Sequence, residues 1–227
     1  MAKYTESEAK QFIEHIAPMI VNEGTKRGYK VFSTTIAQAI IEGACGKSTL
    51  ARDYHNHFGM KTGKSWRQAG KPYAHLKTKE EYQKGVLVEI YADFRSYVDD
   101  LAGVAGYYDF ISTSRYANLK TARNYEEYAQ FLKKDAWATS SVYVDTLCKT
   151  VRKYSLFVYD KEFKVEYFPR IVGQNSIVEA LDSLGVDSSR AYRKKIYQMN
   201  FTDEYKYTAV QNMKLLSLLE QGRLIKP

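Results

Sequence analysis

Apolar residues recur at helical spacing along most of this 227-residue chain, and this periodicity constrains the fold more than any other feature. Thr5 and Glu8 form a capping-box pattern, which predicts a first helix from there to about Gly24. A second helix is predicted from about Ser33 until the glycines at 43 and 46 weaken it. Further helical patterns cover residues 97–111, 125–133, 142–154, 176–184, 188–199 and 207–221.

One segment has strand periodicity. Over residues 78–94 apolar side chains alternate around Gly85, which predicts a short β-hairpin. The polar, glycine-punctuated stretch from about 46 to 76 is expected to be irregular. A domain boundary is predicted at about 159–173, where Pro169 and Gly173 interrupt regular structure. The expected class is α+β and mostly α: a domain with a small β-hairpin over residues 1–160, followed by a small all-α module over 165–227.

Composition narrows the classes of function. The hydrophobic fraction of 44%, with 4 Pro and 13 Gly, predicts ordinary globular folding, and the net charge of +8 favours a polyanionic partner. No apolar run approaches the roughly 18 residues of a membrane span, and the start of the chain lacks the apolar segment of a secretory signal. Two cysteines and four histidines leave little for a disulfide framework or a metal centre, so we expect no metal and no cofactor.

Three motifs look functional but favour simpler interpretations. The segment 43–49 resembles a phosphate loop, yet too few residues separate its glycines to wrap a phosphate. His55 and His57 lack a third ligand at helical or hairpin spacing, so packing is the expected role of this pair. Cys45 with one of these histidines could form a nucleophile and base, although a small buried thiol is the commoner outcome.

Glu42 is a candidate general acid on physical grounds. It is predicted to lie in the last turn of an apolar helix, where the helix dipole and partial burial both disfavour the ionised carboxylate. A carboxyl group with a raised pKa can protonate a leaving oxygen near neutral pH, as a glycosidase requires. Gln38 lies one turn earlier on the same side of the helix, within expected hydrogen-bond reach of Glu42.

Several separated motifs resemble the family 73 N-acetylglucosaminidases, which are peptidoglycan hydrolases with a lysozyme-like α+β fold. The resemblance covers roughly residues 5 to 160. The motifs that carry it are Gln38-Ala39-Ile40-Ile41-Glu42, Gly46-Lys47-Ser48, Asn56-His57-Phe58-Gly59-Met60-Lys61, Phe94-Arg95-Ser96-Tyr97 and Lys153-Tyr154-Ser155-Leu156. By this resemblance, the first domain is lysozyme-like and Glu42 corresponds to the catalytic acid of the family.

The resemblance implies a second carboxylate on the hairpin. Counting from Thr78 selects Glu80, whereas Glu81 precedes Tyr82 and keeps the family's distance to Gly85. Successive strand residues face opposite sides, so only one of the two glutamates can point into a cleft. We favour Glu81.

The chain also has candidate substrate-binding residues, although core packing is the commoner role of any single aromatic among them, and it departs from the family pattern at two places. The expected substrate-binding side chains are Gln38, Asn56, Phe58, Tyr116 and Trp137. The family usually has Ser after the catalytic Glu, where this chain has Gly43, and Tyr before Ala-Thr, where it has Trp137. The second change keeps an aromatic ring but removes the phenolic hydroxyl.

The C-terminal module is similar to small helical wall-binding modules of phage and bacterial lysins. The expected protein is therefore an endolysin-type or autolysin-type hydrolase that cleaves the β-1,4 bond between N-acetylglucosamine and N-acetylmuramic acid, with inverting, retaining and substrate-assisted chemistry all open. Peptidoglycan glycan strands are the expected partner, without nucleic acid or membrane insertion. The alternative is a non-catalytic wall-binding protein that keeps the fold. Because no secretory signal is found, we expect a wall enzyme of this kind to leave the cell by phage-type, holin-like release, or to have lost its leader.

Overall fold

The computed structural model describes residues 4–83, 86–138, 140–161, 166–201 and 203–227, except the side chains of 79–83, 86 and 87. The chain divides into two compact units, Met1–Phe163 and Lys164–Pro227, which are described separately. Within the described residues, no helix has the length and apolar character needed to cross a membrane.

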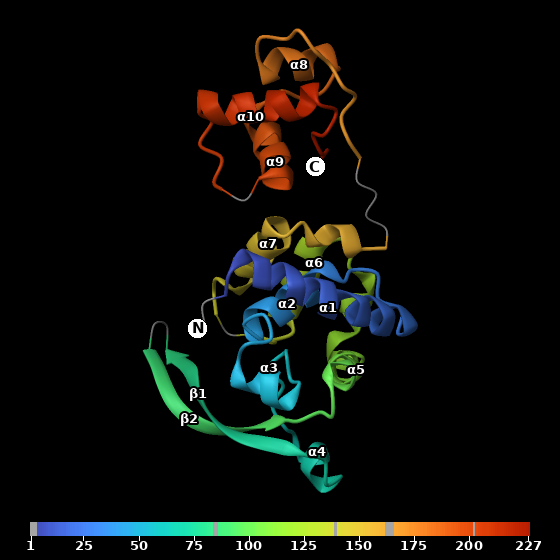
Figure 1. Ribbon diagram of the computed structural model, residues 1–227, viewed down its shortest axis with the longest axis vertical. Coiled ribbons are helices and arrows are strands. Elements are labelled where there is room, and N and C mark those ends of the chain that lie inside the picture. Colours follow the sequence, from blue (N-terminus) through green and yellow to red (C-terminus); the bar gives the residue numbers. More distant parts are fainter. Residues whose placement is uncertain (1–3, 84–85, 139, 162–165, 202) are drawn as a thin grey trace. The chain divides into compact units, whose positions relative to one another are not determined.

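The first unit is mostly helical with one β-hairpin (Figure 1), which confirms the predicted fold class. Its strands are β1 (Tyr73–Gln83) and β2 (Val86–Arg95), paired antiparallel. Its α-helices are α1 (Glu6–Lys26), α2 (Ser33–Glu42), α3 (Thr49–Tyr54), α4 (Lys64–Gln68), α5 (Asp100–Ile111), α6 (Tyr125–Lys134) and α7 (Tyr143–Lys153). Two 3₁₀ segments, η1 (Ser114–Thr121) and η2 (Leu156–Tyr159), complete it.

Helix α1 begins at the predicted capping box, in which the side chains of Thr5 and Glu8 each bond the other residue's backbone N–H. The helix continues to Lys26, beyond the expected end at Gly24. Gly24 has a packing role instead, because a Cβ atom there would lie 2.5 Å from the Tyr108 hydroxyl oxygen. The glycine therefore permits close approach of α5 rather than stopping α1.

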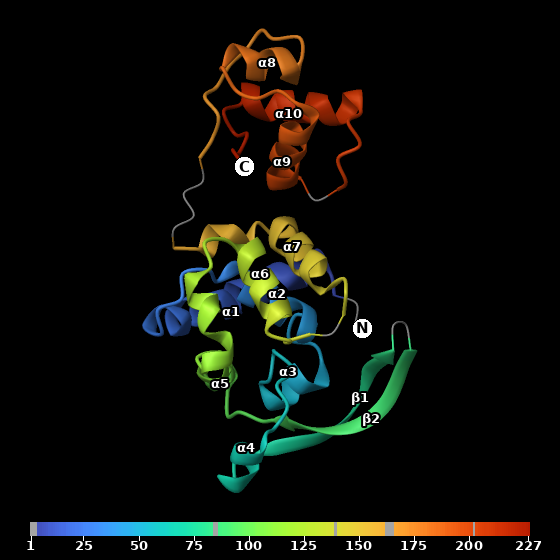
Figure 2. The same ribbon diagram turned by 180° about the vertical axis from the view of Figure 1, so that it is seen from behind.

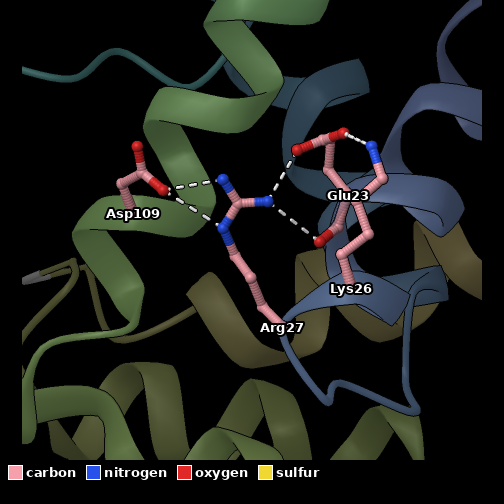
Figure 3. Close-up of polar contacts among 4 residues, drawn as sticks. All are labelled: Glu23, Lys26, Arg27 and Asp109. Atoms are coloured by element: carbon pink, nitrogen blue, oxygen red, sulfur yellow. Dashed lines mark hydrogen bonds and ion pairs between the residues drawn. The ribbon is translucent and has the colours of Figure 1, made fainter.

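An ion-pair network joins the end of α1 to α5 (Figure 3). Arg27 lies between two carboxylates, with Nη1 2.6 Å from Glu23 Oε2 and Nη2 2.7 Å from Asp109 Oδ1. Lys26 adds a second cation on Glu23, at 2.6 Å. These bonds lower the pKa of Glu23 by stabilising its ionised form.

Helix α2 is the central helix of the first unit and packs against α1, α6 and α7. Its N-terminus has no capping side chain of its own, and the Asp160 carboxylate takes that role from the far end of the unit. Asp160 accepts hydrogen bonds from Phe32 N at 2.7 Å, Ser33 N at 2.8 Å and Ser33 Oγ at 2.7 Å. A residue 128 positions from Phe32 in sequence thus fixes the start of this helix.

The stretch expected to be irregular contains α3, α4 and the start of β1, so that expectation was wrong. Local capping explains α3, because Ser48 Oγ accepts a hydrogen bond from Ala51 N and His55 ends the helix in the left-handed region at φ 53°. The predicted hairpin is confirmed but longer, with Tyr73 opposite Arg95 at its base. Figure 1 shows it as a curved ribbon extending from the helical body of the first unit.

The second unit contains α8 (Ile177–Ser183), α9 (Arg190–Asn200) and α10 (Ala209–Glu220), visible from both sides in Figures 1 and 2. Each helix starts at a serine or threonine whose side chain accepts a backbone hydrogen bond. Both Gly185 and Gly222 have a φ of 67°, which confirms the predicted left-handed residues after two helices. A separate core fills the unit: Phe168, Ile177, Ala180, Leu181, Ile196, Tyr197, Tyr205, Leu215, Leu219 and Leu224.

Candidate active site

Glu42 is the last residue of α2, as its sequence pattern predicts. Its side chain reaches solvent, while the protein around it raises its pKa to about 7, chiefly by desolvation. The side chain is thus accessible to solvent, while nearby protein atoms still desolvate its carboxyl group. Glu42 can therefore hold a proton near neutral pH and still meet a ligand.

A chain of buried hydrogen bonds leads from the core to Glu42. The Tyr107 hydroxyl donates to Gln38 Oε1 at 2.5 Å, and Gln38 Nε2 donates to the Tyr143 hydroxyl at 3.0 Å. Tyr143 is in turn hydrogen-bonded to Glu42, which lowers the pKa of Glu42 and partly offsets desolvation. The expected direct bond from Gln38 to Glu42 is replaced by this relay through Tyr143, because Gln38 points into the core and is fully buried.

The loop at 56–61 is packed beside Glu42. Asn56 holds the loop closed, since its amide donates to Met60 O at 2.9 Å and to Arg95 O at 2.8 Å and accepts from Met60 N at 2.9 Å. A Cβ atom at Gly59 would lie 4.0 Å from Glu42 Oε2, and Gly59 has a φ of +65°. The left-handed turn at this glycine thus brings the loop backbone alongside the carboxyl group.

Three histidines converge on Asp100, the first residue of α5. His15 Nε2, His55 Nδ1 and His57 Nε2 each lie 2.7 Å from a carboxylate oxygen of Asp100. These bonds, His57 first, hold the pKa of Asp100 well below its usual range. The nitrogens contact the carboxylate itself, and no metal-binding cluster of three or more His, Cys, Asp or Glu occurs among the described residues. His55 and His57, expected to pack, thus bond the Asp100 carboxylate together with His15 of α1.

The expected substrate-binding side chains lie mostly in the core. Asn56, Phe58 and Tyr116 are buried, and Phe58 stacks on Tyr107 with ring centroids 4.0 Å apart. Trp137 is half-buried and packs on Tyr107 at 5.4 Å, so of the five candidates it alone offers a partly open ring. The other four side chains are buried and therefore not accessible to a ligand.

Glu80 and Glu81 both belong to β1, where Glu80 is paired with Val88 and Glu81 with Leu87. The direction of their side chains lies outside the part of the chain that the structure describes. The choice between the two glutamates stays a prediction.

The two departures from the family pattern have structural counterparts. A Cβ atom at Gly43 would lie 2.7 Å from Ala39 O and 3.3 Å from His57 O, so glycine allows a close approach directly after Glu42. Trp137 packs against Phe110 at 5.9 Å and Tyr116 at 6.0 Å.

Cys45 is buried, and desolvation raises the pKa of its thiol to about 11, which argues against the nucleophile interpretation.

Sequence reasoning missed Tyr143 and Asp100 as parts of this site. Tyr143 begins the apolar face of α7, and that regular helical spacing reads as simple core packing. Asp100 follows Asp99, which caps α5. The histidines that bond Asp100 lie in other segments of the chain, so no short sequence pattern points to it. Both residues act through contacts between segments far apart in sequence.

Comparison with known proteins gives a consistent family. Residues 17–156 match the glucosaminidase family, described as mannosyl-glycoprotein endo-β-N-acetylglucosaminidase. The exo-glucosaminidase LytG of Bacillus subtilis is 35% identical over 57% of this chain and 46% of its own length. The peptidoglycan hydrolase FlgJ of Pseudomonas aeruginosa is 31% identical over 66% of this chain and 38% of its own length, so the chain spans less than half of both relatives.

The fold of the first unit also has a solved counterpart. The catalytic domain of the autolysin Auto from Listeria monocytogenes superposes with a TM-score of 0.56 at 22% identity. The match covers 70% of this chain and 91% of that domain. The likeness places the first unit in the lysozyme-like fold of these domains.

Proposed function

Because this chain belongs to the glucosaminidase family, we propose that it is a peptidoglycan hydrolase that cleaves the β-1,4 bond between N-acetylglucosamine and N-acetylmuramic acid. The curated relatives that resemble it are an exo-glucosaminidase and a peptidoglycan hydrolase. The proposed substrate is the glycan strand of the bacterial wall.

The environment of Glu42 is the observation that carries this proposal. Glycosidic bond cleavage needs an acid that is protonated at working pH and can reach the leaving oxygen. Glu42 has a pKa of about 7 and an open side, and the hydrogen bond from Tyr143 restrains its carboxyl group. In the proposed reaction Glu42 gives its proton to the glycosidic oxygen as the bond to the sugar carbon breaks.

A second group must stabilise the positive charge that develops on the sugar ring or activate water. We assign this role to a carboxylate of β1, with Glu81 favoured over Glu80 on the family spacing. The N-acetyl oxygen of the substrate can serve instead as the internal nucleophile, so the stereochemical outcome stays open.

The second unit is proposed to hold the enzyme on the wall. Its core and helix caps are its own, as expected for a module that adds a second contact without taking part in the chemistry. The proposed site of action is the bacterial wall, reached after release or export from the cell.

The test is the Glu42→Gln variant in an assay that counts new reducing ends released from purified peptidoglycan. The amide is nearly isosteric but has no proton to give, so activity should fall by about 10²- to 10⁴-fold. Glu14→Gln, on the exposed face of α1, is the matched control and should keep wild-type activity. A Glu42→Gln enzyme within a few-fold of wild type removes Glu42 from the mechanism, and an inactive wild type supports the non-catalytic alternative.

A further inference from the structure

Arg95, at the end of β2, lies between two aromatic rings from different helices. Its guanidinium carbon is 4.7 Å from the ring centroid of Trp66 on α4 and 5.2 Å from that of Phe110 on α5. Figures 1 and 2 show α4 and α5 on either side of this end of the hairpin. All three side chains, here called the Arg95 stack, are half-buried, so one edge of the stack meets solvent.

The charge of Arg95 has no counterion among the residues that the structure describes. Its Nε donates to Lys61 O at 3.3 Å and its guanidinium bonds the Tyr97 hydroxyl, but within the described residues it forms no ion pair. The nearby carboxylate of Asp93 is engaged by Arg67 at 3.0 Å and His75 at 2.6 Å. The guanidinium N–H groups that these bonds leave unused can still donate to a carboxylate.

A second cation borders the stack. Lys71 Nζ lies 4.8 Å above the Trp66 ring and likewise has no ion pair in the described part of the chain. Two cations without counterions beside one aromatic surface favour an anionic ligand with an apolar face. A glycan unit that carries a carboxylate has both properties.

A series of side-chain and backbone contacts connects the Arg95 stack to the surroundings of Glu42. The carbonyl oxygen of Arg95 accepts a hydrogen bond from Asn56, whose loop reaches the Glu42 carboxyl group through Gly59. Phe110 packs on Trp137, which packs on Tyr107 of the buried relay to Glu42. A ligand on the stack therefore has a fixed relation to the acid.

We propose that the Arg95 stack binds a substrate carboxylate and makes Arg95 a specificity residue for anionic glycan strands over neutral ones. The inference rests on the proposed function. An N-acetylglucosamine unit is neutral, whereas a muramyl unit carries a lactyl carboxylate, or a stem peptide with carboxylates of its own where the lactyl group is amide-linked. The shared chemistry is a carboxylate on the muramyl side of the strand.

The test compares three preparations of the same glycan strands by kcat/KM for reducing-end release. One has intact stem peptides, one is stripped to free lactyl carboxylates, and one is stripped and then capped as neutral methylamides. Wild type should prefer a carboxylate-bearing strand to the capped strand by about tenfold, the size of one charge-assisted contact. The strand that shows this preference identifies the source of the carboxylate.

Arg95→Met keeps an apolar stem between the rings and removes the charge. It should lose the preference for carboxylate while matching wild type on capped strands, and Arg95→Lys should recover part of the preference. Arg115→Met is the control, because Arg115 is another arginine over an aromatic ring, 5.4 Å from the Tyr116 centroid, but is exposed and lies outside the Arg95 stack. It should keep the wild-type preference, and thermal melts establish that each variant is folded.

The outcomes separate this inference from the proposed function. Wild type with no activity on any strand overturns the proposed function itself. An active wild type without preference, or an Arg95→Met enzyme that keeps the wild-type preference, overturns the role of Arg95. Equal losses on charged and capped strands mean that Arg95 only supports the fold, which also overturns it.

Discussion

The Glu42 carboxyl group combines two opposing influences on its pKa. Desolvation raises the pKa to about 7, and the hydrogen bond from Tyr143 limits that rise. Since a general acid works only when protonated, kcat/KM should fall as the pH rises above about 7, roughly tenfold per pH unit. In the proposed mechanism, Glu42 therefore sets the alkaline limit of activity.

Replacing Tyr143 by Phe should move that limit to higher pH. The variant lacks the hydroxyl that stabilises the ionised form of Glu42, so the pKa of Glu42 should rise and the alkaline limb of kcat/KM should shift upward. Tyr125→Phe, another buried tyrosine, has no bond to Glu42 and should leave the profile unchanged. A downward or absent shift in Tyr143→Phe contradicts the assigned hydrogen bond.

On the hairpin, Glu81→Gln should reduce turnover more than Glu80→Gln. The two residues are neighbours on β1, and successive strand side chains point to opposite faces. Reducing-end release by both variants, measured beside wild type, checks the order. A larger loss in Glu80→Gln means that the spacing from Thr78, rather than that to Gly85, sets the family register.

At the level of the helices, the position of Glu42 depends on an anchor at the opposite end of α2. Glu42 ends α2, and the carboxylate of Asp160 anchors the opposite end through three hydrogen bonds. Burial raises the pKa of Asp160, while those hydrogen bonds act against that rise. Anchoring the start of the helix also fixes where its last residue lies.

Asp160→Ala should lower the free energy of unfolding by about 1–3 kcal/mol, because the backbone N–H groups of Phe32 and Ser33 lose their acceptor. Denaturant unfolding gives this difference. Asp109→Ala removes an aspartate that is mostly exposed and should cost less than about 1 kcal/mol. Equal effects of the two substitutions argue that Asp160 is not an important anchor.

At the scale of the whole molecule, the two units have separate cores and the motifs of the family match lie in the first. A chain of residues 1–163 should fold and cleave short soluble glycans as the full chain does. Its binding to insoluble walls should weaken by about tenfold or more, because the tethered second contact is lost. Co-sedimentation with walls and turnover on soluble strands check the two parts.

The position of the cut matters for this experiment. A chain that ends at residue 159 also loses Asp160, and with it the anchor of α2, so it should be less stable than residues 1–163. If residues 1–163 unfold or lose activity on short glycans, the second unit is part of the catalytic fold. Unchanged wall binding would remove the proposed role of the second unit.

The features that could be predicted from the sequence are those that local interactions encode. Helix periodicity, the capping box at Thr5, the left-handed glycines at 185 and 222 and the hairpin are all properties of short segments, and the structure has each of them. Glu42 was found at the end of its helix for the same reason, since a helix dipole and an apolar face can be read from ten residues.

The surroundings of that carboxyl group, in contrast, depend on contacts between segments that are distant in sequence. The relay through Gln38 and Tyr143, the convergence of three histidines on Asp100 and the cap from Asp160 join segments that are dozens of residues apart. Asn56, Phe58 and Tyr116 were expected at the substrate and lie in the core, because a motif gives residue types but not the direction in which packing turns each side chain.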